Sequence, residues 1–92
     1  MTVTKEGLDM TLATLKTGKK GLITKIEVDD GATKRRLMNM GLLVGEEVYV
    51  DRVAPFGGPI DITIKGYNIS LHKKEAQGII IDIDGSLKEE IY

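Results

Sequence analysis

Short runs of alternating apolar and polar residues, separated by glycines, dominate this 92-residue chain, which contains 11 glycines. The clearest run extends from Ile60 to Lys65, where an isoleucine occupies every second position. A period of two places alternate side chains on opposite faces of a β-strand, so one face of each run is expected to be buried. The pattern predicts five short strands, at residues 20–28, 47–54, 60–65, 67–72 and 79–83. In the first strand, the alternation predicts that Leu22, Ile26 and Val28 face inward.

The period changes between the first and second predicted strands. Residues 32–40 contain neither Gly nor Pro, and their apolar positions follow helical spacing. Asp30 is a plausible N-cap residue, and Gly41 stands where a left-handed residue commonly ends a helix. We therefore expect one short helix after the first strand. A helical turn at residues 73–77 should precede the last strand.

Five strands and one helix favour a small, mainly β barrel over a sandwich or a βαβ fold. The Lys65-Gly66 pair is a candidate for a tight hairpin turn between two of the strands. We expect the domain to span residues 12–84. Residues 1–11 would form an N-terminal extension, and residues 85–92 would form a C-terminal tail.

Composition excludes several classes of function. Cysteine is absent, which removes disulfides and thiolate metal sites, and 13 basic against 14 acidic residues give a net charge of −1. That balance provides no long-range field to attract nucleic acid. The chain has no export signal and no apolar run of about 20 residues, so we expect no membrane insertion and a cytoplasmic location.

Catalytic motifs are also missing. The single histidine, His72, shares a predicted strand face with Ser70, so the two side chains point in parallel and form no triad. Gly57-Gly58 lies between prolines and is not followed by the Lys-Ser or Lys-Thr of a phosphate-binding loop. We therefore predict that the chain is not an enzyme.

Several segments, taken together and in order, resemble the ferrous-iron transport protein A family, FeoA. The segments are Leu12–Gly18, Arg36–Leu42, Val44-Gly45, Ala54–Ile60 and Ile69–Ala76. The resemblance implies an SH3-like barrel and a role in iron homeostasis. It also implies that the chain is a cytoplasmic accessory protein binding the G-protein-containing part of the ferrous-iron permease FeoB, and so peripheral to the inner membrane through its partner. The family pattern usually has arginine at the position of His72.

The segment Pro55-Phe56-Gly57-Gly58 is the leading partner-binding candidate. Phe56 is the only phenylalanine, and it lies in a loop that prolines and glycines constrain. An aromatic anchor on a stiff loop is typical of a binding hot spot. Alternatively, the ring could fold down and cover an open end of the barrel.

A basic cluster on the predicted helix is the second candidate. Arg35 and Arg36 could meet an acidic patch on a partner, or simply form a solvated helix face. Both interpretations remain open from the sequence.

Metal binding is a weaker prediction. Ferrous iron or another transition metal is implied by the family resemblance, but one histidine cannot complete a four-ligand site within a single chain. His72 with Asp82 or Asp84 could share a metal across a homodimer, which would make the chain a small sensor or metallochaperone. Otherwise, His72 is a solvated surface residue. A further alternative is a detached SH3-like domain of a metal-dependent repressor.

Overall fold

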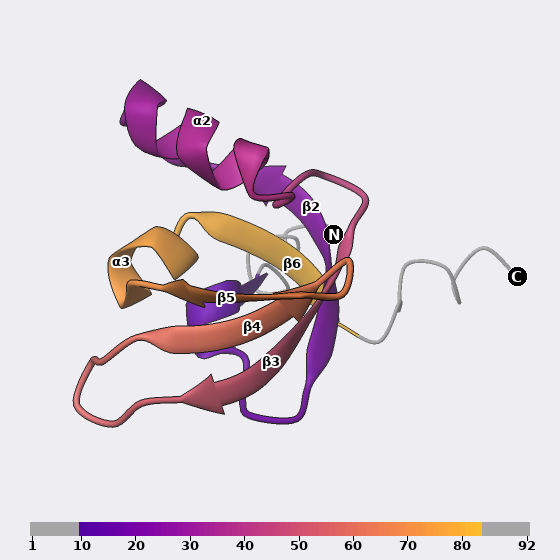
Figure 1. The fold of residues 1–92 in the computed structure, drawn as a ribbon, viewed down its shortest axis with the longest axis vertical. Helices are drawn as coiled ribbons and strands as arrows, with labels where there is room; N and C mark the ends of the chain where they lie inside the picture. The colour runs from indigo at the N-terminus through magenta and orange to yellow at the C-terminus, as the bar shows by residue number, and fades with distance from the viewer. Residues whose placement is uncertain (1–9, 84–92) are drawn as a thin grey trace, which may run out of the picture.

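The computed structural model describes residues 10–83. In this part of the chain, short strands are interrupted at three places by short helical segments (Figure 1). In chain order the elements are β1 (Met10–Thr11), the 3-10 helix η1 (Leu12–Thr14), β2 (Lys20–Ile26), α2 (Gly31–Asn39), β3 (Glu47–Val53), β4 (Ile60–Ile64), β5 (Tyr67–Leu71), α3 (Lys73–Ala76) and β6 (Ile79–Ile83).

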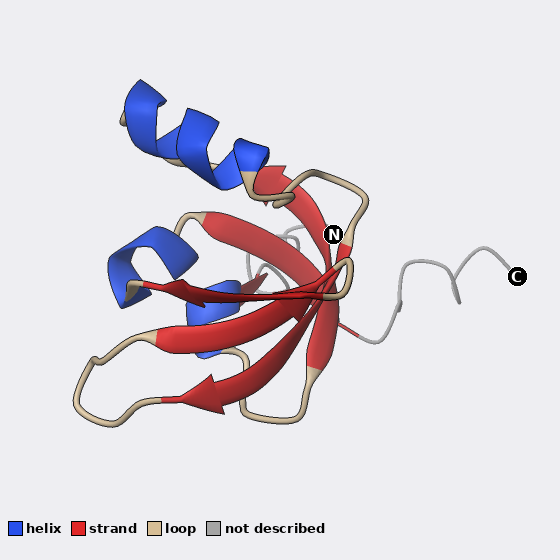
Figure 2. Cartoon of the chain, in the orientation of Figure 1, coloured by secondary structure: helices blue, strands red, loops and turns tan. Residues whose placement is uncertain are grey.

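The strands form one antiparallel sheet in the order β1-β6-β2-β3-β4-β5. The sheet curls strongly, with α2 and α3 on one side of the molecule (Figure 2). The mainly β class is confirmed, but the five-stranded barrel is wrong in detail: residues 10–83 form six strands, with β1 and β5 at the two edges of the sheet. The sequence did not reveal β1 because a strand of two residues is too short to show alternation.

A tight turn joins β4 and β5, as predicted. Lys65 and Gly66 both have positive φ, at 53° and 85°, and Ile64 pairs directly with Tyr67. Two consecutive positive φ values characterise a type I′ turn, whose twist matches that of the flanking strands. The turn fixes the register of the whole β4–β5 hairpin.

The helix after the first long strand is also confirmed. Its C-terminus is closed by two backbone bonds: the N–H of Gly41 donates to the carbonyl of Met38 at 3.0 Å, and that of Leu42 donates to Leu37 at 3.1 Å. Gly41 has a φ of +101°, the left-handed value that this motif requires. Leu37 and Leu42 are completely buried, so they anchor α2 on the sheet.

The prediction of which β2 residues face the core is wrong at the start of the strand. Ile23 is completely buried, whereas Leu22 is half-buried and pairs with Asp82. The pairing of β2 with β6 shifts between Ile23 and Lys25, which marks a bulge with one extra residue. The extra residue reverses the alternation, so Ile23 and Ile26 lie toward the core although they are three positions apart.

The core consists of apolar side chains from all parts of the sheet and from the helices. Its buried members are Leu12, Leu15, Ile23, Leu37, Leu42, Val48, Val50, Ile60, Ile62, Ile64, Leu71, Ala76, Ile79 and Ile81. Between residues 10 and 83 no polar or charged residue is buried. Chemistry and recognition by the described residues therefore take place on the surface. Among these residues, no helix is both long and apolar enough to cross a membrane.

Candidate functional site

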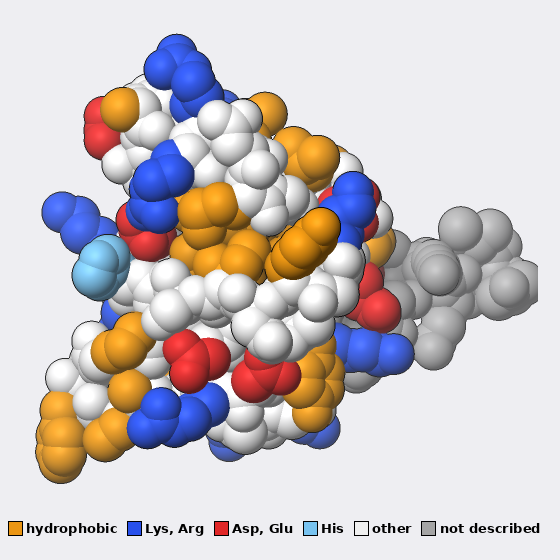
Figure 3. Space-filling model, in the orientation of Figure 1, with side chains coloured by type: hydrophobic (Ala, Val, Ile, Leu, Met, Phe, Trp, Pro, Cys, Tyr) orange, Lys and Arg blue, Asp and Glu red, His pale blue; other side chains and the backbone are white. Residues whose placement is uncertain are grey.

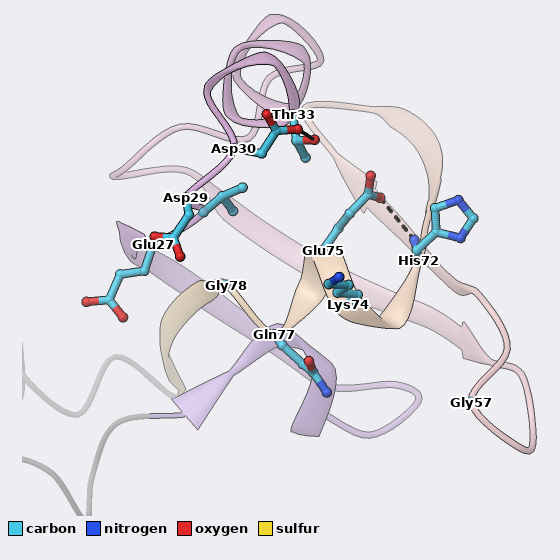
Figure 4. A pocket seen from close by; sticks show the side chains of 11 residues that line it. Glu27, Asp29, Asp30, Thr33, Gly57, His72, Lys74, Glu75, Gln77 and Gly78 are labelled. Carbon is cyan, nitrogen blue, oxygen red and sulfur yellow. Dashed lines mark hydrogen bonds between the residues drawn. The ribbon is translucent and has the colours of Figure 1, made fainter.

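A wide hollow opens between the N-terminal end of α2, the turn of α3 and the loop between β3 and β4 (Figure 4). Thr33 comes from α2, Gly57 from the loop, and Lys74 and Glu75 from α3. Of the predicted partner-binding residues, only Gly57 lines the hollow; Arg35 and Arg36 lie elsewhere on α2, the helix that contributes Thr33. It is open to solvent, which suits a docking surface better than a small-molecule pocket.

The Phe56 loop, residues 54–59, protrudes from the body of the domain. Its hydrophobic side chains form the tip at the lower left of Figure 3. Phe56 is fully exposed, with a relative accessibility of 103%, and has a φ of +57°. The interpretation of this ring as a lid on the barrel is therefore wrong. A bulky residue in the left-handed region is unusual, because this backbone conformation is strained for side chains with a Cβ. The loop holds Phe56 in this conformation with its ring exposed to solvent.

Backbone contacts hold the Phe56 loop in shape. The N–H of Ala54 donates to the carbonyl of Pro59 at 3.0 Å, and the N–H of Gly58 donates to that of Pro55 at 3.1 Å. A Cβ atom at Gly58 would lie 2.7 Å from the Cβ of Ala54, so only glycine fits there without rearrangement. A loop ordered in advance loses little conformational freedom when it binds. Phe56 therefore has the exposure and the support that an interface anchor needs.

The two arginines of α2 have different environments. Arg36 forms an ion pair with Glu75 of α3, and its guanidinium also contacts the sulfur of Met40 at 3.6 Å. Arg35 is exposed and makes no ion pair with any other described residue. Arg36 therefore ties two helices together, whereas Arg35 is available for a partner.

Glu75 is a residue that the sequence interpretation missed. Its side chain is only 13% exposed, and besides Arg36 it accepts a hydrogen bond from the backbone N–H of His72 at 3.1 Å. A glutamate three residues after the N-cap commonly makes this return contact, so the spacing from His72 was the available signal. Glu75 fixes α3 at its start and links it to α2.

Asp30 occupies the N-cap position of α2, as predicted. The hydroxyl of Thr33 donates to Asp30 Oδ2 at 2.6 Å. This hydrogen bond favours the charged carboxylate and lowers the pKa of Asp30 below its ordinary value; backbone N–H groups of the first turn act in the same direction. The N-terminal end of α2 therefore presents a stable negative charge to the hollow.

The two described metal candidates, His72 and Asp82, belong to no metal site within residues 10–83. His72 stands exposed at the start of α3, and its ring points away from Asp30 (Figure 4), while Asp82 lies in β6. Across residues 10–83, no group of three or more His, Cys, Asp or Glu side chains is arranged to hold a metal ion. Asp84 lies outside the described residues. Residues 10–83 of a single chain therefore do not fit a transition metal, and a shared site across a homodimer stays a prediction.

A protein-family model described as the FeoA domain matches residues 10–83. The chain belongs to the FeoA family. A fusion of Fe(2+) transport protein A with the Fe(2+) transporter FeoB, from Porphyromonas gingivalis, is 31% identical over 77 residues. That match covers 84% of this chain but only 9% of the fusion protein.

Solved structures support the same assignment. Iron(II) transport protein A from Clostridium thermocellum is 37% identical, with a TM-score of 0.75 over 83% of this FeoA chain and 46% of the other. FeoA from Stenotrophomonas maltophilia, an SH3 domain protein solved with zinc, is 26% identical, with a TM-score of 0.71 over 79% and 89% of the two chains. The SH3-like fold is therefore confirmed.

A metal-dependent regulator shares this fold too. A manganese-dependent transcriptional repressor is 21% identical, with a TM-score of 0.76 over 82% of this FeoA chain and 36% of the repressor chain. At that identity the likeness concerns the fold alone.

Proposed function

We propose that this FeoA chain is a non-enzymatic accessory protein of bacterial ferrous-iron uptake, which works in the cytoplasm and binds the G-protein-containing part of FeoB. The observation that carries the proposal is the fusion relative, in which a FeoA region and a FeoB transporter share one polypeptide. Fusion keeps two domains at high effective concentration, which benefits domains that contact each other. In separate chains, the same contact requires a docking surface.

We assign that surface to the Phe56 loop and α2, each of which contributes a residue to the lining of the hollow. Phe56 offers a large apolar anchor on an ordered loop, supported by Pro55, Gly57 and Gly58. Arg35 offers an exposed positive charge on α2, a helix that also contributes Thr33 to the hollow. An anchor that fills a pocket, together with a charge at the periphery, is the common arrangement of a protein interface.

Binding to full-length FeoB in lipid nanodiscs tests the proposal, measured without nucleotide, with GDP and with a GTP analogue. We expect binding in at least one state, a tenfold or greater loss for Phe56→Ser, and a smaller, salt-dependent loss for Arg35→Gln. Thr17→Ser, a change at an exposed site away from the hollow, is the control. Absence of binding by the unmodified chain in every state would refute the proposal.

A metal-binding role is the second candidate, favoured by the zinc complex of the Stenotrophomonas maltophilia protein. Because residues 10–83 of one chain contain no three-ligand group, the proposed site forms between two copies through His72 with Asp82 or Asp84. Titration with Zn²⁺ or Fe²⁺ in an ultracentrifuge measures binding and dimerisation together. Equal curves for the unmodified chain and for His72→Ala would exclude His72 as a ligand.

A further inference from the structure

The free edge of β5 carries backbone groups that no described residue satisfies. In a two-residue hairpin, the pair next to the turn exchanges hydrogen bonds, so Tyr67, Ile69 and Leu71 bond to β4. Asn68 and Ser70 alternate with them, and their N–H and C=O groups point away from β4. Neither residue makes another backbone hydrogen bond within residues 10–83. Two donors and two acceptors are thus presented at the spacing of an extended strand.

β5 lacks the features by which proteins usually block an exposed edge. The other edge, β1, is only two residues long. The β2–β6 and β3–β4 pairings contain register shifts, but the β4–β5 ladder runs without one. The five residues of β5 include no charge and no proline. Edges are commonly protected by shortness, lysine, proline or a bulge, so an edge without them is suited to pairing with another chain.

Apolar side chains lie beside the open edge. Tyr67 is 69% exposed and Ile69 is half-buried, and both project from the face of β5 that also carries the buried Leu71. A strand added to this edge would place every second side chain against them. Binding of a strand at the β5 edge would therefore bury apolar surface of Tyr67 and Ile69 and also form backbone hydrogen bonds.

The charges at the two ends of β5 decide which flanking residues of a partner strand fit, because the acidic side chains beside the strand itself are engaged: Asp51 accepts a hydrogen bond from Asn68, and Asp61 pairs with Arg52. Lys73 and Lys74 follow its C-terminal end, are exposed, and form no ion pair with other described residues. Lys65 precedes its N-terminal end and pairs with Glu46 at 3.3 Å. Antiparallel pairing of two β5 edges would set the lysines after one strand near Lys65 of the other copy, which opposes like charges. An acidic partner segment is favoured instead.

We propose that the β5 edge binds an extended segment of FeoB in which apolar residues alternate and acidic residues flank the strand. The choice of FeoB as the source rests on the function proposed above. The recognition chemistry rests on Asn68 and Ser70 for pairing, on Tyr67 and Ile69 for apolar contact, and on the lysines after β5 for charge. This site is separate from Phe56 and would add a second point of attachment.

A proline at position 70 tests the edge selectively. Ser70→Pro deletes an N–H that points away from β4 and places a ring on the open edge, while the β4–β5 bonds remain. Ser70→Thr keeps the N–H and is the matched control. We expect Ser70→Thr to bind FeoB nanodiscs like the unmodified chain, and Ser70→Pro to bind at least tenfold more weakly with an unchanged circular dichroism spectrum. Equal binding by all three proteins would overturn the edge site and leave the proposed function standing.

Hydrogen exchange in the unmodified chain tests the site without any substitution. The amides of Asn68 and Ser70 should exchange fast in the free protein and slowly in the FeoB complex, while the amides of Ile69 and Leu71 are slow in both. A complex that leaves Asn68 and Ser70 fast would refute the site. If the chain self-associates without FeoB and the amides of Asn68 and Ser70 become protected, the edge pairs with a second copy of the chain. That result would also overturn the proposal. A failure of the unmodified chain to bind would instead refute the function on which the choice of partner rests.

Discussion

Replacing Phe56 with asparagine should leave the domain as stable as before, or slightly more stable, although it removes a large hydrophobic side chain. Full burial of such a side chain stabilises a fold by about 1.5–3 kcal/mol. Phe56 is fully exposed, so none of this is lost. Its φ of +57° lies in the left-handed region, where a residue such as phenylalanine costs about 1–2 kcal/mol and asparagine is better tolerated. The expected change in the free energy of unfolding is therefore between zero and a gain of about 1 kcal/mol.

Urea denaturation followed by circular dichroism measures this change, with Ile62→Ala as the reference for a buried position. Ile62 is completely buried, so its truncation should cost about 2–5 kcal/mol. FeoB binding by Phe56→Asn should fall at least tenfold in the same preparation. A destabilisation by Phe56→Asn of more than about 1.5 kcal/mol, as burial of the ring would produce, would show that the ring contributes to packing and would refute the reasoning.

Three further predictions concern the surroundings of the hollow. Gly78→Ala would place a Cβ 2.7 Å from the backbone oxygen of Glu27, so the substitution should lower the free energy of unfolding by about 1–3 kcal/mol. Gly31→Ala is the control: its Cβ would meet nothing within 4 Å, and the substitution should raise the free energy of unfolding by about 0.4–1 kcal/mol. Glu75→Gln should cost on the order of 1 kcal/mol in urea denaturation, and less in an Arg36→Gln background; equal costs would show that the ion pair is not stabilising. Because its folded-state pKa is lowered, Asp30 stabilises the domain fully above its unfolded value of 3.8, and this contribution disappears as pH falls through the folded value. The melting temperature of Asp30→Ala should therefore lie below that of the unmodified chain at pH 6, and the difference should shrink as the pH is lowered below 3.8; a constant difference would contradict the assignment.

Local chemistry made much of the fold predictable. The type I′ turn at Lys65-Gly66 and the helix end at Gly41 both depend on a glycine accepting positive φ, a preference that is visible in the sequence. The three alternating isoleucines of β4 are all buried, as their period predicts. Such features involve residues close together in the chain, so no knowledge of the tertiary structure is needed.

The missed features depend on contacts between distant residues. The bulge after Ile23 arises from pairing with β6, almost 60 positions later, and nothing local marks it. Strand β1 exists only because Met10 and Thr11 meet that same strand. The role of Glu75 likewise required the position of Arg36 on another helix. The position of the Phe56 loop could be predicted from the sequence, but exposure or burial of the ring could not. The outcome depends on the direction in which the β3–β4 hairpin extends from the rest of the domain.

The pairing of β1 with β6 joins the first and last strands of the described domain, with Met10 opposite Ile81. Its entry and exit points therefore lie next to each other. A module built in this way can be attached to a longer polypeptide at either side without breaking its hydrogen-bonded ladder. Gene fusion and separation are then structurally simple events for this family, and the Porphyromonas gingivalis protein shows the joined form.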